Sequence, residues 1–192
     1  MKTPLIFGAR RFETQERRLF NSAYVLSDAG EVYYVYDKIH LVPFGEYIPL
    51  GSFFAHFGIF GLATDGITGF TKGQNSGLVQ MPGVPSFVIS ICYEAIFSEE
   101  IDGRAFSAEW ILQMTNDAWF GKFNGPYQHL ALARMRSIEQ GLPLVRSANT
   151  GVSVVTDSFG RIVNELHLNT QGKMDFYLPK PLKNTVYSLI GA

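Results

Sequence analysis

A buried strand that runs directly into the chain's only cysteine constrains the fold most strongly. Residues 87–91, Phe-Val-Ile-Ser-Ile, follow a turn-forming Met-Pro-Gly-Val-Pro at 81–85, and this pattern of β-branched and aromatic residues predicts a strand. Cys92 stands at the end of that strand, and the helix-compatible residues 95–97 follow shortly after it. The stretch therefore predicts a thiol at a junction between a strand and a helix.

Two interpretations of Cys92 are open on this stretch alone. A helix N-terminus favours negative charge and therefore thiolate over thiol, which suits a nucleophile. Most lone cysteines, however, are small buried hydrophobic residues. Tyr93 and Glu94 follow directly, and a buried strand has no use for two polar-tipped side chains, so the strand ends at Cys92.

Composition limits the class of protein. The 192 residues have the length of one domain, and we expect a single domain over 1–192. Hydrophobic residues make up 46% and charged residues 17%, so we expect some apolar surface to be covered. A net charge of -1 with scattered basic residues argues against nucleic-acid binding.

One cysteine cannot form an internal disulfide, which leaves the redox compartment open. The four histidines are dispersed and have no second cysteine beside them, so we expect no metal site. The N-terminus shows no signal peptide, and no run of 18 or more apolar residues predicts a spanning helix. We therefore expect a chain that is not integral to a membrane by itself.

Strands and helices alternate along the chain, with hairpins inserted, and this order predicts an α/β sandwich. The expected strands are 4–9, 21–26, 31–36, 87–91, 111–115, 152–156 and 161–166, and the expected helices are 98–110 and 127–140. Residues 21–36 and 152–166 each read as a hairpin because a turn containing glycine joins two β-rich runs.

Polar residues follow two of these strands. Lys38 ends the first hairpin, and Glu46 lies eight residues later in a loop with Pro and Gly. Asn116, Asp117 and Trp119 follow the strand 111–115, and in α/β folds ligands bind at strand ends. The alternatives are solvated surface charges for the first pair and a turn with a packed Trp119 for the second group.

Residues 47–64 contain no charged side chain, and their phenylalanines recur at helical spacing, at Phe53, Phe54, Phe57 and Phe60. Pro and Gly interrupt the stretch, so it is too broken to span a bilayer. It is suited to lying on a membrane surface or to forming an apolar lid, and the alternative is a helix packed into the core.

Several motifs extend over most of the chain. They are Tyr-Asp-Lys at 36–38, His-Leu-Val-Pro-Phe-Gly-Glu-Tyr at 40–47, Ile-Cys-Tyr-Glu at 91–94, Thr-Asn-Asp-Ala-Trp-Phe-Gly at 115–121, Gln-His at 128–129 and Arg-Ser-Ala-Asn-Thr-Gly at 146–151. Together these motifs resemble the nitrilase, or carbon–nitrogen hydrolase, superfamily. More narrowly, they are similar to the nitrilase-like domain of the apolipoprotein N-acyltransferases, membrane enzymes of bacterial lipoprotein maturation.

The resemblance implies an αββα sandwich and a Glu-Lys-Cys triad. Cys92 would be the nucleophile, Lys38 would stabilise the oxyanion and thiolate, and Glu46 would be the supporting carboxylate near the site. The remaining motif residues would bind substrate or support the site; these are Tyr93, Glu94, Asn116, Asp117 and Trp119.

The implied reaction takes an acyl chain from a phospholipid as a Cys92 thioester and passes it to the N-terminal amine of a diacylglyceryl-cysteine apolipoprotein. The implied place is the periplasmic side of the bacterial inner membrane, with residues 47–64 at the membrane surface. The resemblance implies no cofactor and no metal.

One motif departs from the family. The family's general-base glutamate lies upstream of the lysine after an early strand, and none of the acids before Lys38 has that setting; they are Glu13, Glu16, Asp28, Glu31 and Asp37. We therefore expect a partial domain, without the family's first strand and helix, that is inactive alone. The alternatives are a soluble nitrilase-type amidase, in which water resolves the thioester, and a non-catalytic domain that binds lipid or a partner.

Overall fold

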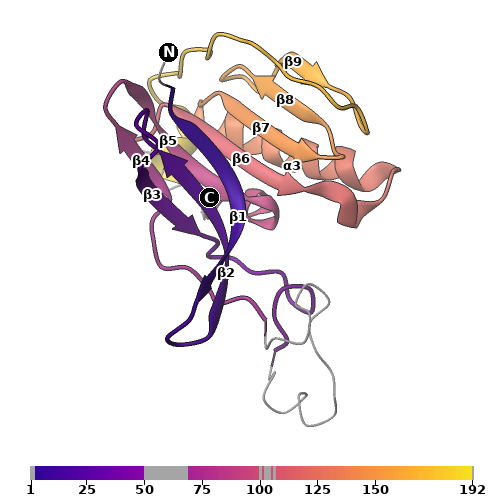
Figure 1. Cartoon of the computed structure of the whole chain (residues 1–192). Helices are drawn as coiled ribbons and strands as arrows, with labels where there is room; N and C mark the ends of the chain where they lie inside the picture. Colours follow the sequence, from indigo (N-terminus) through magenta and orange to yellow (C-terminus); the bar gives the residue numbers. More distant parts are fainter. Residues whose placement is uncertain (1–2, 50–68, 100, 102–104, 106, 192) are drawn as a thin grey trace. The chain divides into compact units, whose positions relative to one another are not determined.

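The computed structural model describes residues 3–49, 69–99, 101, 105 and 107–191 (Figure 1). The chain divides into two compact units, Met1–Ser76 and Gly77–Ala192. The first contains a three-stranded sheet and the second a six-stranded sheet.

The first unit is an antiparallel sheet in the order β1-β2-β3. Its strands are β1 (Leu5–Glu13), β2 (Arg18–Leu26) and β3 (Val32–Asp37). The predicted first hairpin is confirmed as β2 and β3, and its turn is stabilised by backbone N–H groups of Ala29 and Glu31 that donate to the Ser27 hydroxyl.

Strand β1 is longer than the sequence predicted. It continues through Arg10 and Arg11 to Glu13 because it pairs along its whole length with β2, from Leu5 opposite Leu26 to Glu13 opposite Arg18. Pairing with a neighbouring strand therefore overrides the polar composition of this segment.

The second unit is a mixed sheet in the order β4-β5-β6-β7-β8-β9. Its central strands β5, β6 and β7 are parallel, and the outer pairs are antiparallel. The bounds are β4 (Leu78–Met81), β5 (Val84–Ile91), β6 (Trp110–Asn116), β7 (Leu144–Asn149), β8 (Ser153–Thr156) and β9 (Ile162–Leu166). The predicted strand 87–91 is confirmed as the buried half of β5, and the second predicted hairpin is confirmed as β8 and β9.

Helix α3 (Asn124–Gln140) runs along one face of this sheet (Figure 1). Residues Val88, Ile111 and Leu144 from three strands pack with Ala133 of the helix in one core cluster. The helix begins three residues before the predicted Tyr127 and ends as predicted at Gly141, whose left-handed backbone forms the C-cap. The described part of this unit also contains the short helices η1 (Cys92–Ile96), η2 (Asp117–Phe120) and α4 (Val186–Ile190).

The predicted helix 98–110 is wrong at its end. Trp110 lies in β6 opposite Phe87, and the two rings stack with centroids 4.6 Å apart. The indole N–H also donates to the Pro85 carbonyl at 3.0 Å, so pairing with β5 places this residue in the sheet.

Most of the apolar segment 47–64 lies outside the described residues, which stop at 49 and resume at 69. Within the part of the chain that the structure describes, no helix combines the length and the apolar character needed to cross a membrane.

Candidate functional site

In the first unit, Lys38 and Glu46 form a buried ion pair. Lys38 follows β3 directly, and its backbone N–H donates to the Asn21 carbonyl of β2 at 2.8 Å. Its Nζ lies 2.7 Å from Glu46 Oε2, and the lysine side chain is 1% exposed. The alternative of two solvated surface charges is therefore wrong for this pair.

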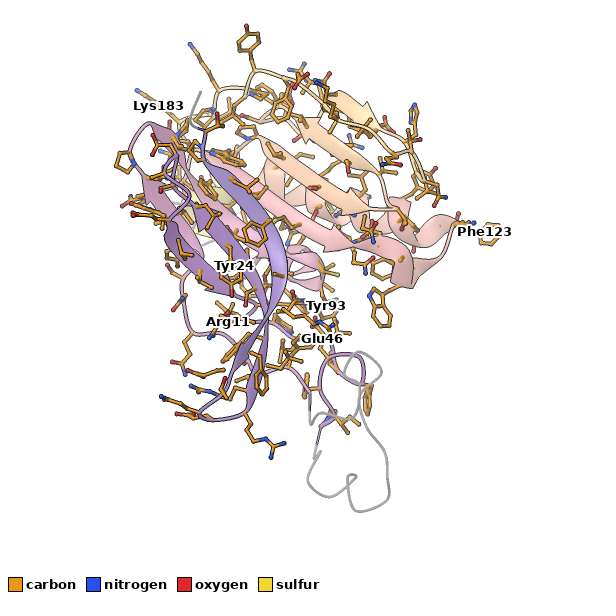
Figure 2. All side chains as sticks on the ribbon, viewed as in Figure 1. Arg11, Tyr24, Glu46, Tyr93, Phe123 and Lys183 are labelled. Carbon is orange, nitrogen blue, oxygen red and sulfur yellow. The ribbon has the colours of Figure 1, made fainter. Side chains whose placement is uncertain are left out.

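Glu46 accepts two further hydrogen bonds. The backbone N–H of Val42 donates to Oε2 at 2.8 Å, and Asn21 Nδ2 donates to Oε1 at 3.0 Å. The loop that carries Glu46, which is labelled in Figure 2, is tight, because the Glu46 backbone N–H also donates to the Val42 carbonyl at 2.8 Å. Glu46 is thus committed as an acceptor that fixes the direction of the Lys38 ammonium group.

A second ion pair holds the residue before the lysine. Arg11 of β1 donates to both carboxylate oxygens of Asp37, at 2.7 and 3.2 Å, and the Ser22 hydroxyl donates to Asp37 Oδ1 at 2.5 Å. The hydrogen bond to Asp37 raises the pKa of Arg11 above its ordinary value, against the opposing effect of desolvation. The end of β3, and with it the start of the Lys38 side chain, is therefore anchored by side chains from the other two strands of its sheet.

In the second unit, Cys92 is the first residue of η1 and is partly buried. Its φ of 52° lies in the left-handed region, which is unfavourable for a residue with a Cβ. The predicted junction is confirmed, but the element after it is a 3-10 helix of five residues. Such a short element has few aligned peptide dipoles, so the expected support of the thiolate by a helix N-terminus is weak.

A buried polar network reaches the backbone of Cys92. His129 Nε2 lies 3.0 Å from the Cys92 carbonyl oxygen, and Gln113 Nε2 donates to the same oxygen at 3.2 Å. His129 Nδ1 lies 2.9 Å from Asp117 Oδ1, and Arg146 Nη2 donates to Asp117 Oδ2 at 2.5 Å. These side chains come from β6, η2, α3 and β7, so four elements converge behind the cysteine.

Burial affects the pKa values of both charged side chains of this network, Asp117 and Arg146. Desolvation acts to raise the pKa of Asp117, but the hydrogen bond from His129 and the charge of Arg146 outweigh it, so this pKa lies below its ordinary value. Burial lowers the pKa of Arg146, opposed by the Asp117 carboxylate and by Cys92.

The remaining predicted residues lie in different settings. Glu94 is fully buried and accepts the Ile91 backbone N–H at 2.7 Å, which closes the turn around Cys92. The Tyr93 ring contacts Phe97 edge to face at 5.1 Å. Asn116 accepts the Ala118 backbone N–H at 3.2 Å, as expected for a turn, whereas Trp119 is 62% exposed and not packed as the turn interpretation required.

Several network residues received no role from the sequence. Gln113 and His129 belong to elements that were predicted simply as a strand and a helix. Arg146 lies on β7, which was not predicted, and Asn21 stands within β2. A signal was available, since a charged or amide side chain inside a buried strand needs a partner. Among the described residues, no three or more His, Cys, Asp or Glu side chains gather as a metal site would require.

A thiol held on a fixed backbone, as at Cys92, suits nucleophilic attack on an acyl carbon. A model of the carbon–nitrogen hydrolase family matches residues 1–176. The chain belongs to the carbon–nitrogen hydrolases.

The curated relatives of this chain carry a narrower name. The chain is 49% identical over 194 residues to an apolipoprotein N-acyltransferase of Bradyrhizobium diazoefficiens. This match covers 98% of the chain and 36% of that relative. The chain is also 48% identical over 174 residues to the apolipoprotein N-acyltransferase of Rhodopseudomonas palustris. This second match covers 91% of the chain and 32% of that relative. The chain thus spans about a third of the length of these relatives.

Solved structures of other carbon–nitrogen hydrolases share the fold. A carbon–nitrogen hydrolase from Helicobacter pylori matches with a TM-score of 0.68 at 18% identity, over 88% of this chain and 60% of that one. Nit3 of Saccharomyces cerevisiae, a nitrilase-superfamily member, matches with a TM-score of 0.65 at 18% identity, over 85% and 55%. These matches confirm the predicted α/β, nitrilase-like fold.

Proposed function

We propose that this chain is the acyl-transferring domain of an apolipoprotein N-acyltransferase. The observation that carries the proposal is 49% identity, across 98% of the chain, to a relative of that name. The buried Lys38–Glu46 pair and the constrained Cys92 supply side chains that the reaction needs. The amidase alternative lacks comparable support, because the amidase structures that match are similar at only about 20% identity and share the fold alone.

The reaction has two steps. The Cys92 thiolate attacks the carbonyl carbon of a phospholipid ester, a C–S bond forms, the C–O bond breaks, and the lysophospholipid leaves after taking up a proton. The α-amine of the diacylglyceryl-cysteine acceptor then attacks the thioester, an amide forms, the amine loses a proton, and the thiolate is regenerated.

Lys38 would stabilise the oxyanion that forms on the carbonyl oxygen in each step. Glu46 would hold the lysine ammonium in place, because it already accepts three hydrogen bonds. For the same reason Glu46 is poorly suited to removing protons, which is the task of a separate base.

Three of the acids before Lys38 are already held by other side chains. Glu13 and Glu16 pair with Arg18 on the hairpin between β1 and β2, and Asp37 is held by Arg11 and Ser22. We propose that the base is a glutamate outside residues 1–192, and we expect the isolated chain to form no acyl-enzyme at a substantial rate.

The proposed substrates are a phospholipid donor and a diacylglyceryl apolipoprotein acceptor, at the periplasmic face of the inner membrane. The relatives' name and the charge-free segment 47–64 support this placement, since an apolar segment suits contact with lipid. An apolar cover would also protect the thioester from water.

A chimera tests the proposal. Residues 1–192 replace the corresponding third of the Bradyrhizobium diazoefficiens relative, and the purified chimera is given phospholipid vesicles and a diacylglyceryl lipopeptide. We expect a hydroxylamine-sensitive acyl group on Cys92, followed by an amide on the lipopeptide. The variant Cys92→Ala should show neither product, and Lys38→Met should form the acyl-enzyme at least ~100-fold more slowly, because an oxyanion donor contributes about that factor.

Two results would contradict the proposal. One is a folded chimera that transfers no acyl group although the parent relative does. The other is hydrolysis of short amides by the chimera without transfer to the lipopeptide, which would make this an amidase.

A further inference from the structure

The buried network behind Cys92 reaches the backbone carbonyl oxygen of that residue. From Arg146 on β7, the contacts lead to Asp117, then to His129 on α3, and then to the Cys92 carbonyl oxygen. Arg146 also donates from Nε to the Val152 carbonyl at 3.2 Å. All three side chains are at least nine-tenths buried, with exposed fractions of 1% for Arg146, 0% for Asp117 and 4% for His129.

The contacted atom belongs to a residue in an unfavourable conformation. Cys92 has a φ of 52° between a strand and a 3-10 helix, where an L-residue is strained and is held only by its surroundings. Its carbonyl oxygen receives side-chain contacts from His129 and Gln113, in place of a ladder bond of the sheet. These contacts favour the orientation of the peptide group that follows the thiol-bearing carbon.

His129 is suited to this contact by its two ring nitrogens. A carbonyl oxygen only accepts hydrogen bonds, so Nε2 must carry a hydrogen to bond to it. Nδ1 faces Asp117, and the carboxylate therefore sets the plane of the ring. Arg146 holds that carboxylate from the other side.

We propose that His129, oriented by Asp117 and Arg146, is a positioning residue that fixes the backbone of Cys92 and thereby keeps its thiolate in a reactive orientation. The inference rests on the proposed function only in taking Cys92 as the nucleophile. His129 exchanges no proton with substrate in this scheme and acts through Cys92.

Two substitutions separate the contact with Cys92 from the contact with Asp117. In His129→Gln, the amide nitrogen reaches the position of Nε2 and can still donate to the Cys92 carbonyl. In His129→Asn, the shorter amide reaches the position of Nδ1, so it keeps the contact with Asp117 and loses the one with Cys92. Both replacements are neutral amides, so they differ in reach and in little else.

The test measures the rate at which iodoacetamide alkylates the full chain at neutral pH. Cys92 is the only cysteine, so all alkylation reports on this thiol. We expect H129N to lower the second-order rate constant about tenfold, the size expected for one hydrogen bond to a buried group. H129Q should stay within about threefold of the unsubstituted chain.

A neighbouring residue of the same helix provides the control for a merely structural role. Leu130 is buried against Val152 and Val154 and has no polar contact with the network. Leu130→Ala should lower the melting temperature by removing core contacts while leaving the alkylation rate unchanged.

The proposal is overturned if H129N is alkylated as fast as H129Q, or if L130A slows alkylation as much as H129N. The readout needs no acyl substrate, so it is independent of the proposed function. A chimera that fails to transfer acyl groups while the H129N and H129Q rates still differ would refute acyl transfer and leave the positioning role standing.

Discussion

Removing the charge of Glu46 should destabilise the first unit strongly. Glu46→Gln keeps the size of the side chain but leaves the Lys38 ammonium, 1% exposed and 2.7 Å away, facing a neutral amide. Breaking a buried ion pair by removing one partner costs about 3–5 kcal/mol, because a buried charge is left without compensation. Since about 1.4 kcal/mol corresponds to a factor of ten, the unfolding equilibrium of this sheet should shift by ~100-fold to ~4,000-fold.

Hydrogen exchange is the suitable assay for this change. Both tryptophans, Trp110 and Trp119, lie in the second unit, so their fluorescence does not report on the first. Exchange of backbone amides in peptides covering β2 and β3 should accelerate in E46Q, while peptides from β5 to β7 should be unchanged.

The double variant Lys38→Met/Glu46→Gln decides whether the buried charge is the cause. It removes the ammonium group as well, so we expect it to recover most of the lost protection. Protection in E46Q equal to that of the unsubstituted chain, or a double variant less stable than either single one, would refute the argument.

Two further predictions concern the second unit. Because the pKa of Asp117 is lower in the folded chain than its ordinary value of about 3.9, its ionised form stabilises the unit above about pH 4, and this contribution is lost as the pH falls through the lowered value. Asp117→Asn should therefore weaken the dependence of unfolding free energy on pH below about 4, measured by tryptophan fluorescence, and an unchanged acid profile would contradict the assignment. Gly151→Ala should cost about 1–3 kcal/mol, because the new Cβ would lie 2.7 Å from Asp117 Cβ; a variant with an unchanged melting temperature would show that the carboxylate can move aside.

The sequence predicted the elements whose patterns are local. The strand in 87–91, the turn at Gly30 and the end of α3 at Gly141 depend on residues close together in the chain, and all three are confirmed. Strand β7 was not predicted, because Arg146 and Asn149 break the apolar pattern that identifies a buried strand. Its place in the sheet depends on pairing with β6, which lies far away in sequence.

The candidate site likewise contains residues whose positions could be predicted from the sequence and contacts that could not. The Lys38 and Glu46 positions were visible as strand-end and loop residues, but their burial was not, since charged residues in loops are exposed by default. The contact between Arg146 and Asp117 joins residues 29 apart, and that between His129 and Cys92 joins residues 37 apart. Neither spacing produces a periodic pattern, so the network behind the cysteine emerged only from the fold.

The three parallel strands β5, β6 and β7 have a consequence for how the second unit folds. Cys92 follows β5, Asp117 follows β6 and Arg146 lies on β7, so the network behind the cysteine is complete only after the third strand has paired. Pairings between distant parallel strands form late, because the intervening chain must first be ordered. The strained backbone at Cys92 is therefore secured at the end of folding, and a chain released before β7 docks carries a thiol without its fixed geometry.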